Sequence, residues 1–280
     1  MKKLLLSLIL ITLALFSVAC SGKSGDAKDA EGETKHIKIG VSGTDTRVWD
    51  HVAEKAKKEG IEIEVVTFSD YVLPNTALAE GELDANSFQT VAYFDEFIKD
   101  QKLDLVPIAT TIIAPMAIYS EKYKDVSEIP DGSTIAVPND ESNMGRALLL
   151  LQEAGLIKLP EDFNGLGSLE VIKENPKNLK IEPVVAAQTP RVLPDVAASV
   201  INNGVAVDAG FSPTEDSMMH ENETATPYIN IIAVRAEDKD NETLKKVAEL
   251  YQSEDTKKFI EKEYKGNQIP TFVPLEKIGW

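Results

Sequence analysis

The sequence predicts an α/β fold arranged in two blocks, and three observations support this. Alternating runs rich in β-branched residues are typical of strands, and amphipathic runs that end at glycine are typical of helices. From His36 onward the two kinds of run alternate, as they do where helices join parallel strands. A second set of alternating runs starts at Ser133, which suggests a second lobe.

The first block opens with a strand, a helix that stops at Gly60 and a second strand. These three elements form the right-handed crossover unit of a parallel sheet. Two short helices and two further strands complete the block. We expect strands at 36–43, 61–68, 105–109 and 116–119, and helices at 48–58, 74–80 and 91–99.

The second block opens with a strand and a long, very apolar helix that stops at Gly155. The apolar surface of this helix predicts that it is buried. Ligands of such folds bind outside the carboxyl ends of the strands or in the cleft between lobes. We expect strands at 133–137, 179–185, 205–209 and 229–234, and helices at 143–154, 194–202, 242–251 and 255–264.

The first residues of the chain have the pattern of a signal peptide, predicted at 1–19. Lys2 and Lys3 precede an apolar run, 4–16, of 13 residues. This run is shorter than the roughly 20 residues that cross a bilayer. Cys20 is the only cysteine, so the chain cannot form an intramolecular disulfide or a multi-cysteine metal site.

Cys20 follows Ala19 in a motif that resembles a bacterial lipobox. The resemblance implies that Cys20 carries diacylglyceryl and palmitate groups, which anchor the protein in the membrane. The usual lipobox has Leu at the position of Ser17, so cleavage after Ala19 without lipidation stays an alternative, as does a buried, unmodified cysteine. Residues 20–35 form a predicted flexible tether, because they contain almost no apolar surface to bury.

Composition and missing motifs argue against several functions. The formal charge of −17 becomes −19 once Lys2 and Lys3 leave with the signal peptide. So negative a chain is not expected to bind nucleic acid or to contact a membrane surface through charge. The three histidines show no metal-ligand spacing, and the chain has neither a phosphate-binding loop nor a nucleophile elbow. We therefore expect no metal, no cofactor and no enzymatic activity.

Aromatic and amide side chains mark two candidate ligand-binding stretches. Tyr71 lies at the carboxyl end of a predicted strand, where its ring can wall a pocket or simply pack at an edge. The second stretch places the polar amide of Asn86 close in sequence to the aromatic rings of Phe88 and Tyr93. By pattern alone, a loop with core aromatics accounts for this second stretch as well.

A charged side chain and two further amides complete the candidate site. Arg146 lies in the first turn of the predicted helix, where backbone N–H groups and a guanidinium together favour a carboxylate. An arginine there opposes the helix dipole, so we expect a ligand carboxylate as its partner, with a nearby Asp or Glu as the alternative. Asn202 and Asn230 adjoin apolar runs and either bind an ammonium or carboxylate group or cap their elements.

These stretches resemble the methionine-binding lipoprotein family (NlpA lipoproteins), the substrate-binding components of methionine ABC importers. The similarity extends from about Ile37 to Trp280, with several long motifs in the family's order. The matching motifs are DYVLPN (70–75), DANSFQ (84–89), VPND (137–140), GRALLLLQ (145–152), GLIKL (155–159), ENPKNLK (174–180) and GW (279–280).

The resemblance implies a two-lobed periplasmic-binding-protein fold, type II-like, with the ligand cleft between the lobes. Lobe 1 is predicted at 36–116 and 230–280, and lobe 2 at 117–229. The implied protein is a lipid-anchored lipoprotein on the extracytoplasmic face of the cell membrane. It is expected to bind an amino acid, L-methionine above others, and to deliver it to the permease and ATPase subunits of an ABC transporter.

The resemblance also implies a role for each candidate residue. Arg146 is expected to bind the α-carboxylate, and Asn202 and Asn230 to hold the amino and carboxylate ends. Sulfur–aromatic contacts add about 0.3–1.5 kcal/mol when a thioether meets aromatic rings. The rings expected to wall the thioether side chain are those of Tyr71, Phe88 and Tyr93.

Two positions depart from the family pattern. Family members commonly have His where this chain has Thr90, and often an aromatic residue where it has Ala114. Both changes remove bulk or polarity near the expected pocket, so a methionine-containing dipeptide or another apolar amino acid remains an alternative ligand. An alternative from a different class is a surface lipoprotein that acts in adhesion or signalling.

Overall fold

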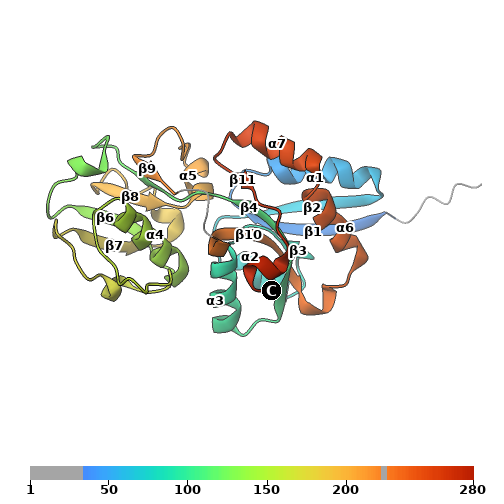
Figure 1. Cartoon of the computed structure of the whole chain (residues 1–280). Helices are drawn as coiled ribbons and strands as arrows, with labels where there is room; N and C mark the ends of the chain where they lie inside the picture. The colour runs from blue at the N-terminus through green and yellow to red at the C-terminus, as the bar shows by residue number, and fades with distance from the viewer. Residues whose placement is uncertain (1–33, 222–225) are drawn as a thin grey trace, which may run out of the picture. The chain divides into compact units, whose positions relative to one another are not determined.

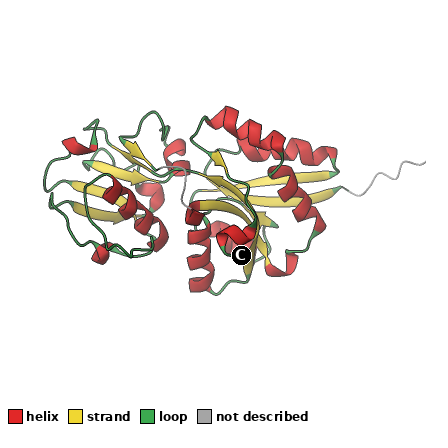
Figure 2. Ribbon diagram, in the orientation of Figure 1, coloured by secondary structure: helices red, strands yellow, loops and turns green. Residues whose placement is uncertain are grey.

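Two β-sheets organise the part of the chain that the computed structural model describes, residues 34–221 and 226–280 (Figure 1). Helices accompany both sheets, as the colouring by secondary structure shows (Figure 2). The predicted signal peptide, Cys20 and nearly all of the predicted tether lie outside the described residues. Within the described ranges, no helix has the length and apolar character needed to cross a bilayer.

The first sheet has six strands in the order β11-β4-β10-β3-β1-β2. β1 runs parallel to β2 and to the short β3, whereas β10 runs antiparallel to β4. The strands are β1 (Lys35–Ser42), β2 (Ile61–Phe68), β3 (Ala85–Asn86), β4 (Leu105–Ile113), β10 (Ile229–Arg235) and β11 (Ile269–Pro270).

Helices cover both faces of the first sheet. In β10, Ile232 and Val234 pack into the hydrophobic cluster of α1, α6 and α7, while Ile231 and Ala233 pack into the cluster of α2 and α3. Because successive strand residues point to opposite faces, the two clusters lie on opposite sides of the sheet. The helices are α1 (Arg47–Lys58), α2 (Leu73–Ala79), α3 (Val91–Gln101), α6 (Glu242–Tyr251) and α7 (Glu254–Tyr264).

The second sheet has five strands in the order β7-β6-β8-β5-β9. β6 runs parallel to β7 and β8, and β5 runs antiparallel to β8 and β9. The apolar helix predicted to be buried is α4, in which Leu148, Leu150 and Leu151 are at most 1% exposed. The elements are β5 (Ala117–Tyr119), β6 (Thr134–Pro138), α4 (Glu141–Glu153), β7 (Lys180–Val184), β8 (Ala198–Ile201), α5 (Asn203–Asp208) and β9 (Met219–His220).

The chain passes between the two sheets twice. It leaves the first sheet at Ile113 and enters the second at Ala117; we call the residues between them the first crossing. It leaves the second sheet at His220 and returns at Ile229, and we call the residues between these two the second crossing. The first sheet therefore takes its strands from both ends of the described chain. The residues at which the lobes divide stay a prediction.

Two predictions for the second block are wrong. Residues 194–202, predicted as a helix, contain strand β8, and residues 205–209, predicted as a strand, belong mostly to α5. A short apolar run does not distinguish a buried strand from a buried helix by its periodicity. β8 is a strand because it pairs with β5 and β6, which are distant in sequence.

Candidate functional site

A cavity of about 660 Å³ is lined by residues of both lobes. Its walls come from the carboxyl ends of β1 and β2, the turn before α3, the first turns of α4 and the segment that joins β8 to α5. The α/β architecture predicts a ligand site at such strand ends. Six of the seven predicted ligand-binding residues line the cavity: Tyr71, Phe88, Tyr93, Arg146, Asn202 and Asn230.

Three aromatic rings form one wall of the cavity. The ring centroids of Tyr71, Phe88 and Tyr93 lie 6.0–6.2 Å apart, and two of the three pairs meet edge to face. The hydroxyl of Tyr93 donates to the carbonyl oxygen of Tyr71 at 2.9 Å, which fixes the orientation of its ring. Burial raises the pKa of both tyrosines above the ordinary value. The wall is therefore uncharged at neutral pH and suited to an apolar group.

Asn86, the seventh predicted residue, lies behind the wall and does not line the cavity. Its amide donates to the carbonyl of Pro74 at 3.1 Å and to Oδ1 of Asn75 at 2.8 Å. Gln89 completes a buried amide cluster, because it exchanges two hydrogen bonds of 2.7 Å with Asn75 and donates to Asn86 at 3.0 Å. The role predicted for Asn86 therefore changes from ligand contact to support of the loop that carries Phe88.

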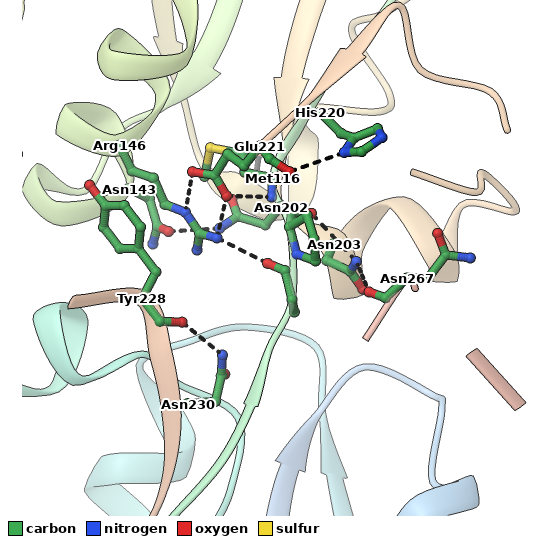
Figure 3. Close-up of polar contacts among 12 residues, drawn as sticks. Met116, Asn143, Arg146, Asn202, Asn203, His220, Glu221, Tyr228, Asn230 and Asn267 are labelled. Carbon is green, nitrogen blue, oxygen red and sulfur yellow. Dashed lines mark hydrogen bonds and ion pairs between the residues drawn. The ribbon is translucent and has the colours of Figure 1, made fainter. Parts of the chain in front are cut away.

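Arg146 is buried at the start of α4 and is paired with an acid of the protein itself. Its Nε lies 2.7 Å from Oε1 of Glu221 and its Nη2 lies 2.5 Å from Oε2, a bidentate pair (Figure 3). Of the two partners considered for Arg146, the structure thus supplies the protein carboxylate. Glu221 does not line the cavity, whereas Arg146 does. The guanidinium is consequently held by Glu221 and also faces the ligand space.

The same guanidinium contacts both crossings. Nη2 donates to the carbonyl oxygen of Ala114 in the first crossing at 3.0 Å. The ring of Tyr228, at the end of the second crossing, lies 4.4 Å from the guanidinium carbon, within cation–π range. Burial raises the pKa of Tyr228 to about 12, an effect that Arg146 opposes and Glu221 reinforces. Tyr228 is therefore a neutral ring at physiological pH.

Asn202 lines the cavity and has an unpaired hydrogen-bond acceptor, and the reason can be traced through two neighbours. Asp140 caps α4 by accepting from the backbone N–H of Asn143 at 2.9 Å, and it also accepts from the side-chain Nδ2 of Asn143 at 2.9 Å. A carboxylate only accepts, so Asn143 must turn its Oδ1 toward Asn202, whose Nδ2 donates to it at 2.7 Å (Figure 3). Oδ1 of Asn202 is then buried, with no hydrogen-bond partner among the described residues.

Asn230 lies at the start of β10, where the backbone ties it to the loop that carries Phe88. Asn230 forms an isolated antiparallel bridge with Thr90, and the N–H of Ile231 donates to the carbonyl of Gln89 at 3.1 Å. The side-chain Nδ2 of Asn230 lies 3.4 Å from the carbonyl of Tyr228, a long hydrogen bond. Its amide is therefore held only weakly by the protein.

Sequence reasoning missed three residues of the site. Asn143 had a usable signal, because it lies one turn before Arg146 on the same helix face. Glu221 had none, since it lies 75 residues from Arg146 along the chain. Trp49 in α1 also lines the cavity, with its ring 5.0 Å from that of Tyr251. Its place in an amphipathic helix indicated core packing rather than a site.

The arrangement is suited to binding a small molecule. One cavity is lined by Arg146, by Asn202 with its unpaired amide oxygen, and by an uncharged aromatic wall. Within the described ranges, no three His, Cys, Asp or Glu side chains are grouped so that they could hold a metal ion. A two-lobed α/β fold with such a cavity defines the class of solute-binding proteins.

Comparison with known proteins places the chain within that class. Residues 37–272 match the NlpA lipoprotein family. The chain is 44% identical to the D-methionine-binding lipoprotein MetQ of Salmonella typhi, covering 90% of this chain and 93% of that one. It is 39% identical to the uncharacterized lipoprotein YhcJ of Bacillus subtilis, with coverages of 100% and 97%. The chain belongs to the NlpA lipoprotein family.

A solved structure shows the same fold. A nutrient binding protein from Burkholderia cenocepacia, bound to methionine, is 47% identical and superposes with a TM-score of 0.81, covering 84% of this chain and 100% of that one. The predicted family and the two-lobed α/β fold are confirmed. The members are non-enzymatic solute-binding lipoproteins, which confirms that the chain is not an enzyme. Membership implies a lipid-anchored, extracytoplasmic location.

Proposed function

We propose that this protein binds L-methionine or a closely related amino acid in the interlobe cavity and delivers it to an ATP-driven importer. The observation that carries the proposal is a pair of buried polar side chains that line the cavity: Arg146, and Asn202, whose Oδ1 has no hydrogen-bond partner among the described residues. A free amino acid offers a carboxylate to the first and an ammonium to the second. Relatives named as binding methionine support the choice of ligand.

The two ends of the ligand find different partners. Glu221 accepts hydrogen bonds from Nε and Nη2 of Arg146, and the carbonyl of Ala114 accepts a second one from Nη2. No hydrogen bond among the described residues engages Nη1. We assign the ligand carboxylate to this free nitrogen, assisted by the loosely held amide of Asn230. The ammonium group donates to Oδ1 of Asn202, which can only accept.

The aromatic wall accounts for the ligand's side chain. Tyr71, Phe88 and Tyr93 offer ring faces and edges to an unbranched apolar chain, and thioether–ring contacts are worth about 0.3–1.5 kcal/mol. Thr90 and Ala114 also line the cavity, where the family often has larger side chains. These departures from the family pattern keep a methionine-containing dipeptide or another apolar amino acid as the second candidate ligand.

The cavity is lined by residues of both lobes, so closure of the lobes around the ligand is the proposed response to binding. A protein whose binding site is divided between lobes signals occupancy when the ligand shifts the population toward the closed form. The permease and ATPase subunits of the importer are the proposed partners that recognise this form, and lipidated Cys20 is the proposed anchor that keeps the protein near them.

A thermal unfolding scan tests this function. The mature protein is mixed separately with the twenty L-amino acids, D-methionine and Gly-Met. Ligand at 100 times its dissociation constant adds about 2.7 kcal/mol to the free energy of unfolding, and this raises the midpoint by several degrees. We expect L-methionine to give the largest rise. No shift with any compound would contradict the proposal and favour an adhesion or signalling role.

A further inference from the structure

Glu221 has an unusual position for a carboxylate that does not line the cavity. Its side chain is 14% exposed and binds two groups at once: the guanidinium of Arg146 and, through Oε2, the backbone N–H of Met116 at 2.8 Å. Its own N–H donates to the carbonyl of Met116 at 2.9 Å. Glu221 therefore joins the start of the second crossing to the end of the first and is fixed by both (Figure 3).

The pairing changes the charge that the cavity offers to a ligand. A buried guanidinium without a partner attracts any anion, whereas a guanidinium already matched by a carboxylate is neutral as a pair. Three further carboxylates line the cavity without an ion pair among the described residues, and they belong to Asp70, Asp140 and Asp208. Arg191 is the other lining cation, and its side chain is exposed.

We propose that Glu221 is a positioning residue that holds Arg146 and sets the charge of the site, so that the cavity selects zwitterions over anions. The inference rests on the proposed function and specifies its ligand class as compounds with a carboxylate and a charged amine. A ligand that brings only a carboxylate adds an unbalanced negative charge beside Glu221. A ligand that also brings an ammonium group leaves the net charge of the site unchanged and offers a donor to Asn202.

The test compares two ligands that differ in charge. Calorimetry measures the dissociation constants of L-methionine, a zwitterion, and N-acetyl-L-methionine, an anion, for the mature protein and for Glu221→Gln. Glutamine keeps the size of the side chain and removes its charge. We expect the wild-type protein to prefer methionine at least 100-fold. Glu221→Gln is expected to lower this preference about tenfold or more, because the guanidinium then lacks its own counter-charge.

Two further variants separate charge from position. Glu221→Asp keeps the charge but shortens the reach, so we expect both affinities to fall while the preference for methionine stays. Glu174→Gln is the matched control, since it removes one carboxylate from an exposed pair with Lys158 at 2.6 Å. This control changes the net charge of the protein equally, and we expect it to leave both affinities and the preference unchanged.

Each outcome decides one question. An unchanged preference in Glu221→Gln overturns the inference, while methionine binding by the wild-type protein leaves the proposed function intact. If the wild-type protein binds no amino acid, the proposed function itself fails. Should Glu221→Gln not fold, the wild-type protein alone is decisive, because equal affinity for methionine and N-acetyl-L-methionine would also overturn the inference.

Discussion

At the scale of single residues, the site depends on which atoms are already satisfied. Arg146 illustrates how far sequence reasoning reaches. Its type and its place at the start of an apolar helix predicted a carboxylate partner, but only the fold could identify Glu221 as that partner. Asn86 shows the converse. Its proximity in sequence to Phe88 predicted a ligand contact, but its side chain is already hydrogen-bonded to the amides of Asn75 and Gln89 and to the carbonyl of Pro74.

The unpaired oxygen of Asn202 gives the first prediction. Asn202→Ala removes the acceptor that we assign to the ligand's ammonium group. A hydrogen bond to a charged group contributes about 1.5–3 kcal/mol, so the affinity for L-methionine is expected to fall by roughly 10- to 150-fold in calorimetry.

A second ligand provides the control for Asn202→Ala. 4-(Methylthio)butanoate keeps the carboxylate and the thioether but has no ammonium group. Its affinity, weaker from the outset, is expected to change little in the variant. An equal loss for both ligands would show that Asn202 acts on the shape of the cavity rather than on the amine.

At the scale of elements, local pattern identified most helices and strands to within a few residues. It did so because amphipathic helices such as α1 and alternating strands such as β2 carry their periodicity in the sequence. It failed at β8 and α5, because contacts with neighbouring elements, rather than local periodicity, decide the conformation of such short apolar runs. It also failed to predict β3, β9 and β11, each of two residues, because strands this short exist only through their partners.

The close approach of α4 to a loop gives a prediction at this scale. A Cβ atom added to Gly145 would lie 2.0 Å from the carbonyl oxygen of Gly165, a contact with backbone that cannot rotate away. Alanine favours a helix over glycine by about 1 kcal/mol, but overpacking costs about 1–3 kcal/mol. We expect Gly145→Ala to lower the free energy of unfolding, measured by urea denaturation without ligand.

Gly204 in α5 is the matched control for that substitution. A Cβ atom there meets nothing within 4 Å, and the residue is helical. Gly204→Ala is therefore expected to raise the free energy of unfolding by about 0.5–1 kcal/mol. If Gly145→Ala were stabilising to the same degree, the tight packing between α4 and the loop would be contradicted.

At the scale of the whole molecule, binding and anchoring are expected to be separable. Cys20 precedes the folded body, and we predict that Cys20→Ser abolishes lipidation and moves the protein from the membrane fraction to the aqueous fraction of expressing cells. The melting shift with L-methionine is expected to stay unchanged, because the described residues that line the cavity begin at Val41, well after Cys20. Ser21→Ala is the control and should remain in the membrane fraction.

The placement of the two tryptophans has a practical consequence. Trp49 is buried against the cavity, whereas Trp280 is 38% exposed and packs beside Phe94 at 5.6 Å. The fluorescence of Trp49 is therefore an intrinsic reporter of ligand binding in the cavity. With Trp280→Phe as background, we expect titration with the ligand to shift or quench the emission of Trp49. If the emission stays constant while calorimetry shows that the ligand saturates the protein, the ligand binds elsewhere in the protein.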